Sequence, residues 1–247
     1  MRFDILTLFP EMFSGPLNTS ILGKARANGL LSVNLWDIRD SALDKHRIVD
    51  DTPYGGGAGM VLKPDVLVRA IESVPHSAQA PVIYLTPQGK VFNQKLAEEL
   101  AREPHLILVS GHYEEIDERV RQGWVDLELS IGDYVLTGGE LPALVVVDAV
   151  SRHIPGVLGD DRSAQEDSFQ DDLLDHPHYT RPYSFRGKEV PQVLLSGHHE
   201  LIRRWRLKEA LRRTMLRRPD LLERRNFSKE EKDILDEIKK EHYKERR

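Results

Sequence analysis

The amino-acid sequence predicts an α/β protein with a mainly parallel sheet, helices on both faces of that sheet, and a small, mostly helical C-terminal domain. Two observations predict this fold class. Strand-like and helix-like segments alternate from residue 3 to residue 154, and the alternation then stops at a polar, acidic stretch. The 247 residues are 40% hydrophobic and 30% charged, which excludes a largely disordered chain and suffices for one large domain or two small ones.

Each strand and helix of the first part is predicted from apolar spacing and from stop signals. In the segment 92–101, Phe92, Leu96 and Leu100 recur at every fourth residue, which is typical of a helix with one buried face. Glycine or proline follows several of the predicted helices, as expected where a helix ends. The predicted strands are 3–9, 31–38, 81–85, 105–110 and 125–131, and the predicted helices are 20–27, 65–74, 92–101, 115–121 and 141–154.

The second part begins after an acidic connection. Residues 157–175 hold seven Asp and Glu against one Arg, which is typical of an interdomain linker. A strand over 189–195 is followed by three helical pieces, and the last opens with Ser228 and Glu231 at the spacing of a capping box. The predicted domains are 1–158, a linker over 159–175, and a basic helical domain over 176–247.

Charge is distributed unevenly along the chain. Residues 200–225 carry a net charge of +6 and residues 1–199 carry −11, within a total of −5. A basic end on an acidic body favours a polyanion contacted mainly at that end, although solvated, arginine-rich helix faces explain the same charge equally well. Five arginines of the basic segment are candidates for neutralising RNA phosphates: Arg203, Arg204, Arg206, Arg212 and Arg213.

Several classes of protein and site are excluded by what the sequence lacks. With no cysteine there is no disulfide framework, thiolate metal site or cysteine nucleophile. The longest apolar run, 143–147, is too short to span a bilayer, and Asp4, Pro10 and Glu11 interrupt the first apolar stretch, which is therefore not a secretory signal. We expect a cytoplasmic protein. The standard motifs of P-loop, dinucleotide-binding, zincin and serine-hydrolase sites are also absent.

Glycine-containing segments follow three of the predicted strands, at residues 85–89, 110–115 and 130–140. Since the carboxyl ends of parallel strands meet at one edge of a sheet, these segments favour a ligand pocket, although each taken alone is more typical of an ordinary turn. Glycine lets the main chain approach a ligand closely. A fourth glycine-rich segment, 50–60, lacks the Lys-Ser/Thr of a phosphate loop and is interpreted as a lid or a loop facing nucleic acid, or as a simple mobile connection.

The same segments carry a resemblance to a known family. The strings that carry it are DDTPYGGGAGM (50–60), YLTPQG (84–89), SGHYEEIDERV (110–120), SIGDYVLTGGELPAL (130–144), DSFQDDLLDHPHYTRP (167–182) and VPQVLLSGHHELIRRWR (190–206). With these strings in the same order, the chain resembles the bacterial tRNA (guanine-N1)-methyltransferases of the TrmD family from the first strand to at least residue 222. The resemblance implies a SPOUT-class catalytic domain with a deep trefoil knot that binds S-adenosylmethionine, a homodimer with the active site at the subunit interface, and methylation of guanosine 37 at N1 in tRNA.

The resemblance also implies residue roles. Asp167 matches the family's general base and Arg152 its catalytic arginine, whereas Asp172 stands where the family commonly has glycine. Magnesium dependence is implied as an option, but the sequence shows no ligand cluster and we assign no metal site. The residues implied to surround the methyl donor are Tyr84, Leu85, Gly111, Tyr113, Glu114, Ser130, Ile131, Gly132, Asp133, Tyr134, Val135, Leu136, Gly138, Gly139 and Pro142.

These roles are chemically consistent with methylation of guanine. N1 of guanine carries a proton and is a poor nucleophile until a base such as Asp167 removes it, and a guanidinium such as Arg152 stabilises the charge that moves to O6. Two alternatives are a knotted methyltransferase that acts on ribose 2'-hydroxyls or another base, and a non-catalytic RNA-binding protein of the same fold. The segment 167–182 disfavours a methyltransferase that acts on ribose or another base. The intact glycine segments disfavour a non-catalytic RNA-binding protein.

Overall fold

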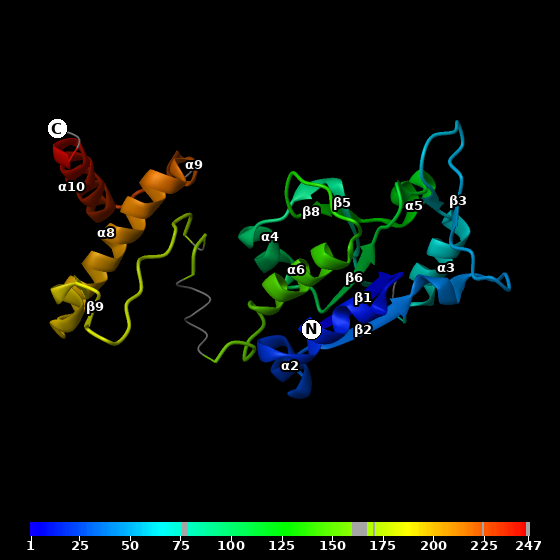
Figure 1. Ribbon diagram of the computed structural model, residues 1–247, viewed down its shortest axis with the longest axis horizontal. Coiled ribbons are helices and arrows are strands. Elements are labelled where there is room, and N and C mark those ends of the chain that lie inside the picture. Colours follow the sequence, from blue (N-terminus) through cyan, green and yellow to red (C-terminus); the bar gives the residue numbers. More distant parts are fainter. Residues whose placement is uncertain (76–78, 160–166, 170, 224, 246–247) are drawn as a thin grey trace. The chain divides into compact units, whose positions relative to one another are not determined.

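The computed structural model describes residues 1–75, 79–159, 167–169, 171–223 and 225–245. Contacts within the chain divide it into two compact units, Met1–Asp161 and Arg162–Arg247. Figure 1 shows the first unit as a sheet with helices and the second as a small helical body. Among the described residues, no helix combines the length and the apolar character needed to cross a bilayer.

A five-stranded sheet forms the centre of the first unit. Every neighbouring pair is parallel, in the order β2-β1-β6-β5-β8, so the predicted parallel sheet is confirmed. Two of its strands, β1 and β6, lie in the middle and are almost completely buried, as apolar runs without alternation predict. The strands are β1 (Arg2–Thr7), β2 (Ser32–Asp37), β5 (Val82–Val91), β6 (His105–Ser110) and β8 (Leu127–Ser130).

Helices cover both faces of this sheet, as predicted, because successive strand side chains point to opposite sides. In β6, Leu106 and Leu108 join one hydrophobic cluster, whereas Ile107 and Val109 join the other. The first cluster is covered by α1 (Ser14–Asn18), α2 (Ser20–Ala27), α4 (Gln94–Leu100) and α6 (Glu140–Ser151), and the second by α3 (Pro64–Ser73), α5 (Glu118–Trp124) and the 3-10 helix η2 (Ile38–Ser41).

One predicted helix begins later than expected. The prediction of a helix over 115–121 is wrong in its first part, because β7 (Glu115–Ile116) pairs with β4 (Val61–Leu62), which itself pairs with β3 (Asp50–Asp51). Helix α5 starts only after Asp117, whose carboxylate accepts a hydrogen bond from the backbone N–H of Arg119 at 2.9 Å. The small sheet β3-β4-β7 therefore connects the glycine-rich segment 50–60 to the segment that follows β6.

The second unit is built on helices, as predicted. Its helices are α8 (His199–Arg217), α9 (Pro219–Glu223) and α10 (Lys229–Glu245), and Leu211 packs with Ile234 and Ile238 in their core. Ser228 and Glu231 form the predicted capping box, with Ser228 N donating to Glu231 Oε2 at 2.7 Å and Glu231 N donating to Ser228 Oγ at 3.2 Å.

The strand predicted over 189–195 is wrong. A two-stranded hairpin of β9 (Ser184–Phe185) and β10 (Lys188–Glu189) precedes it, and Gln192–Leu195 forms the 3-10 helix η4. Pro191 lacks a backbone N–H and stands directly before this turn, which ends strand pairing there. Within the linker region, Asp172 has a φ of +53°, the left-handed conformation expected at a position where glycine is common. Residues 160–166 and 170 of the predicted linker lie outside the described residues.

A buried carboxylate joins three strands at the end of the sheet opposite the glycine segments. Asp4 of β1 is fully buried, and its Oδ1 accepts from Trp36 Nε1 at 2.7 Å and Asn34 Nδ2 at 3.0 Å, both on β2. Its Oδ2 lies 2.5 Å from His105 Nε2 and 2.6 Å from Arg2 Nε. Burial by itself raises the pKa of Asp4, but these donors outweigh it and hold the pKa below its ordinary value.

We predict that Asp4→Asn lowers the free energy of unfolding by about 2–4 kcal/mol at pH 7, because an amide cannot accept from all four donors. Since the folded-state pKa of Asp4 is depressed, its stabilisation is present above the ordinary pKa and is lost as the pH falls through the folded value. The difference in free energy of unfolding between Asp4→Asn and the parent protein should therefore become smaller in acid. Urea denaturation followed by circular dichroism measures this.

The matched control for this prediction is Asp40→Asn, which removes a carboxylate of 64% exposure paired with Arg47. It should leave the urea midpoint unchanged. Equal midpoints for Asp4→Asn and the parent at pH 7 would contradict the prediction.

Candidate functional site

The three glycine segments surround one cavity at the carboxyl ends of β6 and β8 and beside residues 85–89 of β5. Its volume is about 270 Å³. Every residue that we expected around a methyl donor lines it except Asp133. The cavity is also lined by residues that we did not single out as binding residues, namely Thr86, Pro87, Gln88, His112, Glu115, Leu129 and Thr137. Most of these residues lie inside the three glycine segments. Their place in a segment, and not their residue type, is the sequence feature that could have identified them as cavity residues.

The first segment is a bulge inside β5 and not, as predicted, a loop after its end. Leu85 and Lys90 both pair with Leu129 of β8, so the four residues between them leave the ladder. The main chain at Gly89 then lies against β8, where an added Cβ would stand 2.4 Å from Leu129 N. The bulge places Thr86, Pro87 and Gln88 on the wall of the cavity.

The second and third segments approach each other very closely. Gly139 N donates to Gly111 O at 2.9 Å, and a Cβ on Gly139 would lie 2.6 Å from Ser110 Cα. A Cβ on Gly111 would lie 2.7 Å from the hydroxyl of Tyr84. An added side chain would meet main-chain atoms at Gly139 and the buried side chain of Tyr84 at Gly111, so both positions favour glycine.

Aromatic and apolar side chains line the cavity together with backbone groups. Tyr84 is buried, whereas Tyr113 and Tyr134 are partly exposed, and Tyr113 adopts a φ of +61° that turns the chain. Partial burial, and then the nearby charge of Asp50, raise the pKa of Tyr113, so it stays a neutral phenol. The combination of tyrosines with the main chain of the glycine segments suits a flat, partly polar ligand.

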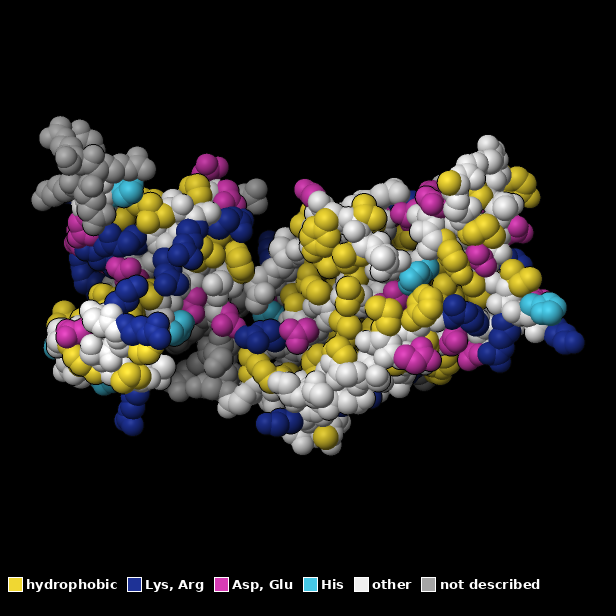
Figure 2. Space-filling view, in the orientation of Figure 1, with side chains coloured by type: hydrophobic (Ala, Val, Ile, Leu, Met, Phe, Trp, Pro, Cys, Tyr) yellow, Lys and Arg dark blue, Asp and Glu magenta, His cyan; other side chains and the backbone are white. Residues whose placement is uncertain are grey.

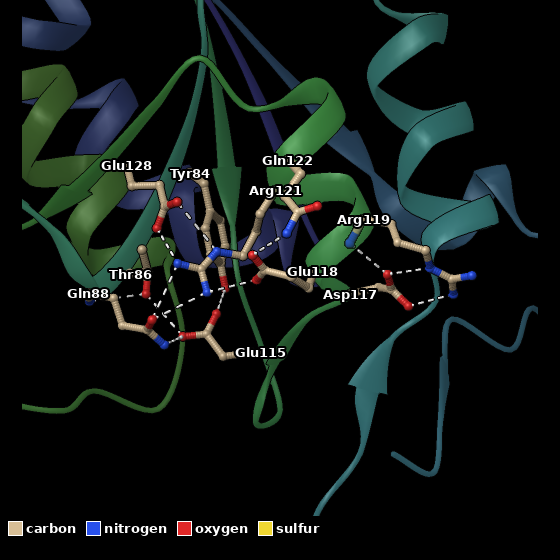
Figure 3. Close-up of polar contacts among 10 residues, drawn as sticks. All are labelled: Tyr84, Thr86, Gln88, Glu115, Asp117, Glu118, Arg119, Arg121, Gln122 and Glu128. Carbon is tan, nitrogen blue, oxygen red and sulfur yellow. Dashed lines mark hydrogen bonds and ion pairs between the residues drawn. The ribbon is translucent and has the colours of Figure 1, made fainter. Parts of the chain in front are cut away.

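A polar network at one wall of the cavity centres on Glu115 (Figure 3). Its carboxylate accepts hydrogen bonds from the hydroxyl of Tyr84, from Thr86 Oγ1 at 3.0 Å and from Gln88 Nε2 at 3.2 Å. Arg121 extends the network by donating to Gln88 Oε1 at 3.3 Å and, on its far side, to Glu128. Burial, and then the hydrogen bond to Glu115, raise the pKa of Tyr84 well above its ordinary range.

Sequence reasoning selected Glu114 from this segment and missed Glu115. The exposed Glu114 lies against the glycine-rich segment 50–60, because its backbone N–H donates to Met60 O at 3.0 Å and a Cβ on Gly59 would lie 2.3 Å from its Oε1. Glu115 instead fixes the first and second segments to each other. A buried tyrosine such as Tyr84 needs a hydrogen-bond partner, which is the signal that could have identified Glu115.

The two expected catalytic residues belong to different units. Arg152 is partly buried and follows the last residue of α6 in the first unit. Asp167 is partly buried in the second unit. Each of the two takes part in at least one interaction with another group. Their catalytic roles stay predictions.

The five candidate RNA-binding arginines fall into two groups, and Figure 2 shows Lys and Arg side chains gathered over the helical unit. Arg204 and Arg212 point at α10, where they pair with Glu237 at 2.5 Å and Glu241 at 2.6 Å, and Arg203 bridges Glu200 and Glu230. Arg206 and Arg213 make no ion pair among the described residues. With the exposed, likewise unpaired Arg217, they recur at intervals of seven and four residues and so share one face of α8.

One group of potential metal ligands forms among the described residues, in the second unit. Ligand atoms of Asp175, His176 and His178 all lie within 4.8 Å of one another. Asp175 Oδ2 and His178 Nε2 already form a hydrogen bond at 2.6 Å, and His176 Nδ1 lies 3.2 Å from Pro177 O. These groups satisfy one another without an ion, and we assign no metal to them.

Comparison with known proteins identifies the family of the chain. Residues 1–224 match the family model described as tRNA (Guanine-1)-methyltransferase TrmD. The chain is 61% identical to the tRNA (guanine-N(1)-)-methyltransferase of Moorella thermoacetica over 96% of each chain, and 58% identical to that of Carboxydothermus hydrogenoformans over 95% of this chain and 92% of the relative. It is 55% identical to that of Dictyoglomus turgidum over 98% of each. The chain belongs to the tRNA (guanine-1)-methyltransferase family and is an enzyme of that class.

Proposed function

We propose that this enzyme transfers the methyl group of S-adenosylmethionine to N1 of guanosine 37 in tRNA. The observation that carries the proposal is the single cavity in which all three glycine segments meet, lined by nearly every residue that the family resemblance implies for the donor site. Family membership supports the reaction class. The position of the target guanosine in tRNA, the assignment of the cavity as the donor site and the roles of individual residues are our inferences.

The cavity fits a nucleoside-type donor. Backbone groups of the glycine segments can recognise the edge of a purine, and the tyrosines with Leu136 and Ile131 enclose its faces. When bound, the donor supplies a methyl group on a positively charged sulfur. The exposed carboxylate of Glu114, on the cavity wall, attracts that charge.

In the proposed mechanism two side chains act on the guanine. The carboxylate of Asp167 accepts the proton of N1 as N1 becomes a nucleophile, and the guanidinium of Arg152 stabilises the negative charge that develops on O6. No metal is needed to activate a sulfonium methyl. The remaining rate acceleration then comes from alignment of N1 with the methyl carbon.

The family also implies a trefoil knot in the donor-binding part of the chain. The close contact of the third segment with the second, where Gly139 N donates to Gly111 O, supports it, because a knotted chain must bring backbone segments that are distant in sequence into contact. We include the knot in the proposal.

A homodimer is supported by an apolar surface on the first unit. Helix α6 buries Ala143, Val146 and Val150 against the sheet but leaves Leu141 and Val145 on its outer side 49% and 44% exposed. Val135, beside the cavity, is 85% exposed. Exposed apolar side chains next to a site are typical of a surface covered by a second subunit. We propose that Arg152 and Asp167 act on the donor bound by the partner.

We place tRNA on the unpaired arginines of α8. Among the residues that the structure describes, Arg206, Arg213 and Arg217 form no ion pair and can therefore neutralise phosphates, whereas Arg203, Arg204 and Arg212 already pair with carboxylates. This divides the five residues that the sequence suggested into RNA-contacting and structural positions.

A methylation assay on tRNA transcripts tests the reaction itself. With labelled S-adenosylmethionine, a transcript with guanosine at position 37 should be methylated, and one with adenosine there should stay unlabelled because adenine carries an amino group in place of the O6 on which Arg152 stabilises negative charge. Mapping the label to N1 excludes the alternative of ribose or other-base methylation. Equal labelling of both transcripts would refute the assigned target.

The role of Asp167 predicts a specific kinetic change. Asp167→Asn should lower kcat by a factor of about 10² to 10⁴, since general-base catalysis typically contributes that much, with donor affinity by calorimetry nearly unchanged. A large loss of donor affinity would instead make Asp167 a structural residue.

Mixed dimers extend the same test to the subunit arrangement. Leu136→Arg places a cation in the cavity wall and should abolish donor binding. If Asp167 acts on the partner's donor, mixing this variant with Asp167→Asn restores one working site in each mixed dimer. Absence of any recovery after proven subunit exchange would place the base and its donor in one subunit.

The RNA surface predicts a change in salt dependence. Reversing Arg206 and Arg213 to Glu should weaken tRNA binding and reduce the slope of log affinity against log salt by about 1–2. The matched control reverses Lys239 and Lys240 of α10, which is the same change of charge on another helix of the unit. An equal effect of both pairs would show that α8 does not provide the specific surface.

A further inference from the structure

We infer that Glu140 is a positioning residue for the methyl donor, acting through a hydrogen-bonded latch of Thr7, Glu140 and His112. This inference rests on the proposed function, because it concerns the same cavity. It assigns a task to a buried carboxylate and to a cavity residue that the proposed mechanism does not use. The donor itself need not touch Glu140.

Glu140 is the first residue of α6 and is only 1% exposed. Its Oε1 accepts from Thr7 Oγ1 at 2.6 Å, and its Oε2 lies 2.8 Å from His112 Nε2. A buried carboxyl group is costly unless each oxygen is bonded, and the N-terminal end of a helix favours negative charge. The two short contacts therefore hold this side chain firmly in place.

The latch joins segments that are far apart in the sequence. Thr7 ends β1, and its hydroxyl also accepts from the backbone N–H of Phe9 at 2.9 Å. The Phe9 ring packs against the His112 ring, and the two ring centroids lie 4.8 Å apart. Thr7, Glu140, His112 and Phe9 thus form a closed circuit of contacts. His112 lines the cavity between Gly111 and Tyr113, so the circuit fixes the second glycine segment.

Gly138 shows how tightly the latch is built. A Cβ at this position would lie 2.2 Å from His112 Nε2 and 2.5 Å from Glu140 Oε2. Any side chain there would separate the two partners. We expected Gly138 among the donor-binding residues; the geometry gives it the further task of leaving room for the bond between His112 and Glu140.

Breaking the latch should weaken donor binding without changing tRNA binding. We expect Thr7→Val, which removes the hydroxyl, and His112→Ala to raise the donor Kd by about tenfold or more, in calorimetry with S-adenosylmethionine. The KM for the donor should rise more than kcat falls. The double variant should lose less than the sum of the single losses, because both act through Glu140. Thr7→Ser keeps a hydroxyl and should restore most of the affinity.

A matched control separates positioning from general stability. Asp4 is a carboxylate as deeply buried as Glu140, and it lies on β1, the strand that also carries Thr7, but it does not line the cavity. Asp4→Asn should lower the unfolding midpoint and leave the donor Kd unchanged at a temperature where every variant is folded.

The inference would be overturned if Thr7→Val and His112→Ala both bound the donor with the affinity of the unaltered protein. It would also be overturned if Asp4→Asn lost as much donor affinity as these two variants. Failure of the proposed function looks different, because then the unaltered protein itself would not bind the donor or methylate guanosine 37.

Discussion

The close contact of two main-chain segments at Gly111 and Gly139 is the constraint on which the site depends. Here Gly139 N lies 2.9 Å from Gly111 O, and an added side chain would meet main-chain atoms at Gly139 and the buried side chain of Tyr84 at Gly111. Residues of both segments line the cavity. The parallel pairing of β5 with β6 and with β8, and the position of α6, bring these two segments to the same edge of the sheet.

Local sequence patterns correctly predicted the elements whose ends are determined by neighbouring residues. The helix Ser20–Ala27 and the strand His105–Ser110 have the predicted bounds, because caps and apolar runs determine them. The pairing of Glu115–Ile116 with Val61–Leu62 and the bulge between Leu85 and Lys90 were not predicted. Both depend on which strand lies alongside, and a short segment does not encode its distant partner.

The same limit applies to the side chains of the site. Glycine segments after parallel strands indicated the cavity, since chain topology alone brings them together. Glu115 and His112 escaped notice because their partners, Tyr84 and Glu140, lie about 30 residues away in the sequence. Charge counts likewise could not separate Arg206 from Arg204, although only the second is paired with a carboxylate of α10.

Two buried carboxylates associated with β1 illustrate how one strand serves stability and function separately. Asp4 binds β1 to the strands on both sides of it, so its contacts act on the sheet as a whole. Glu140 binds the last residue of β1 to two segments of the cavity, so its contacts act on the site. Both groups are buried to the same degree, and therefore burial alone does not reveal a function. What distinguishes them is the partner: Asp4 bonds to residues held by the ladder, whereas Glu140 bonds to His112 in a loop that has no ladder to hold it. A costly buried carboxylate is informative where the backbone it fixes would otherwise be free to move.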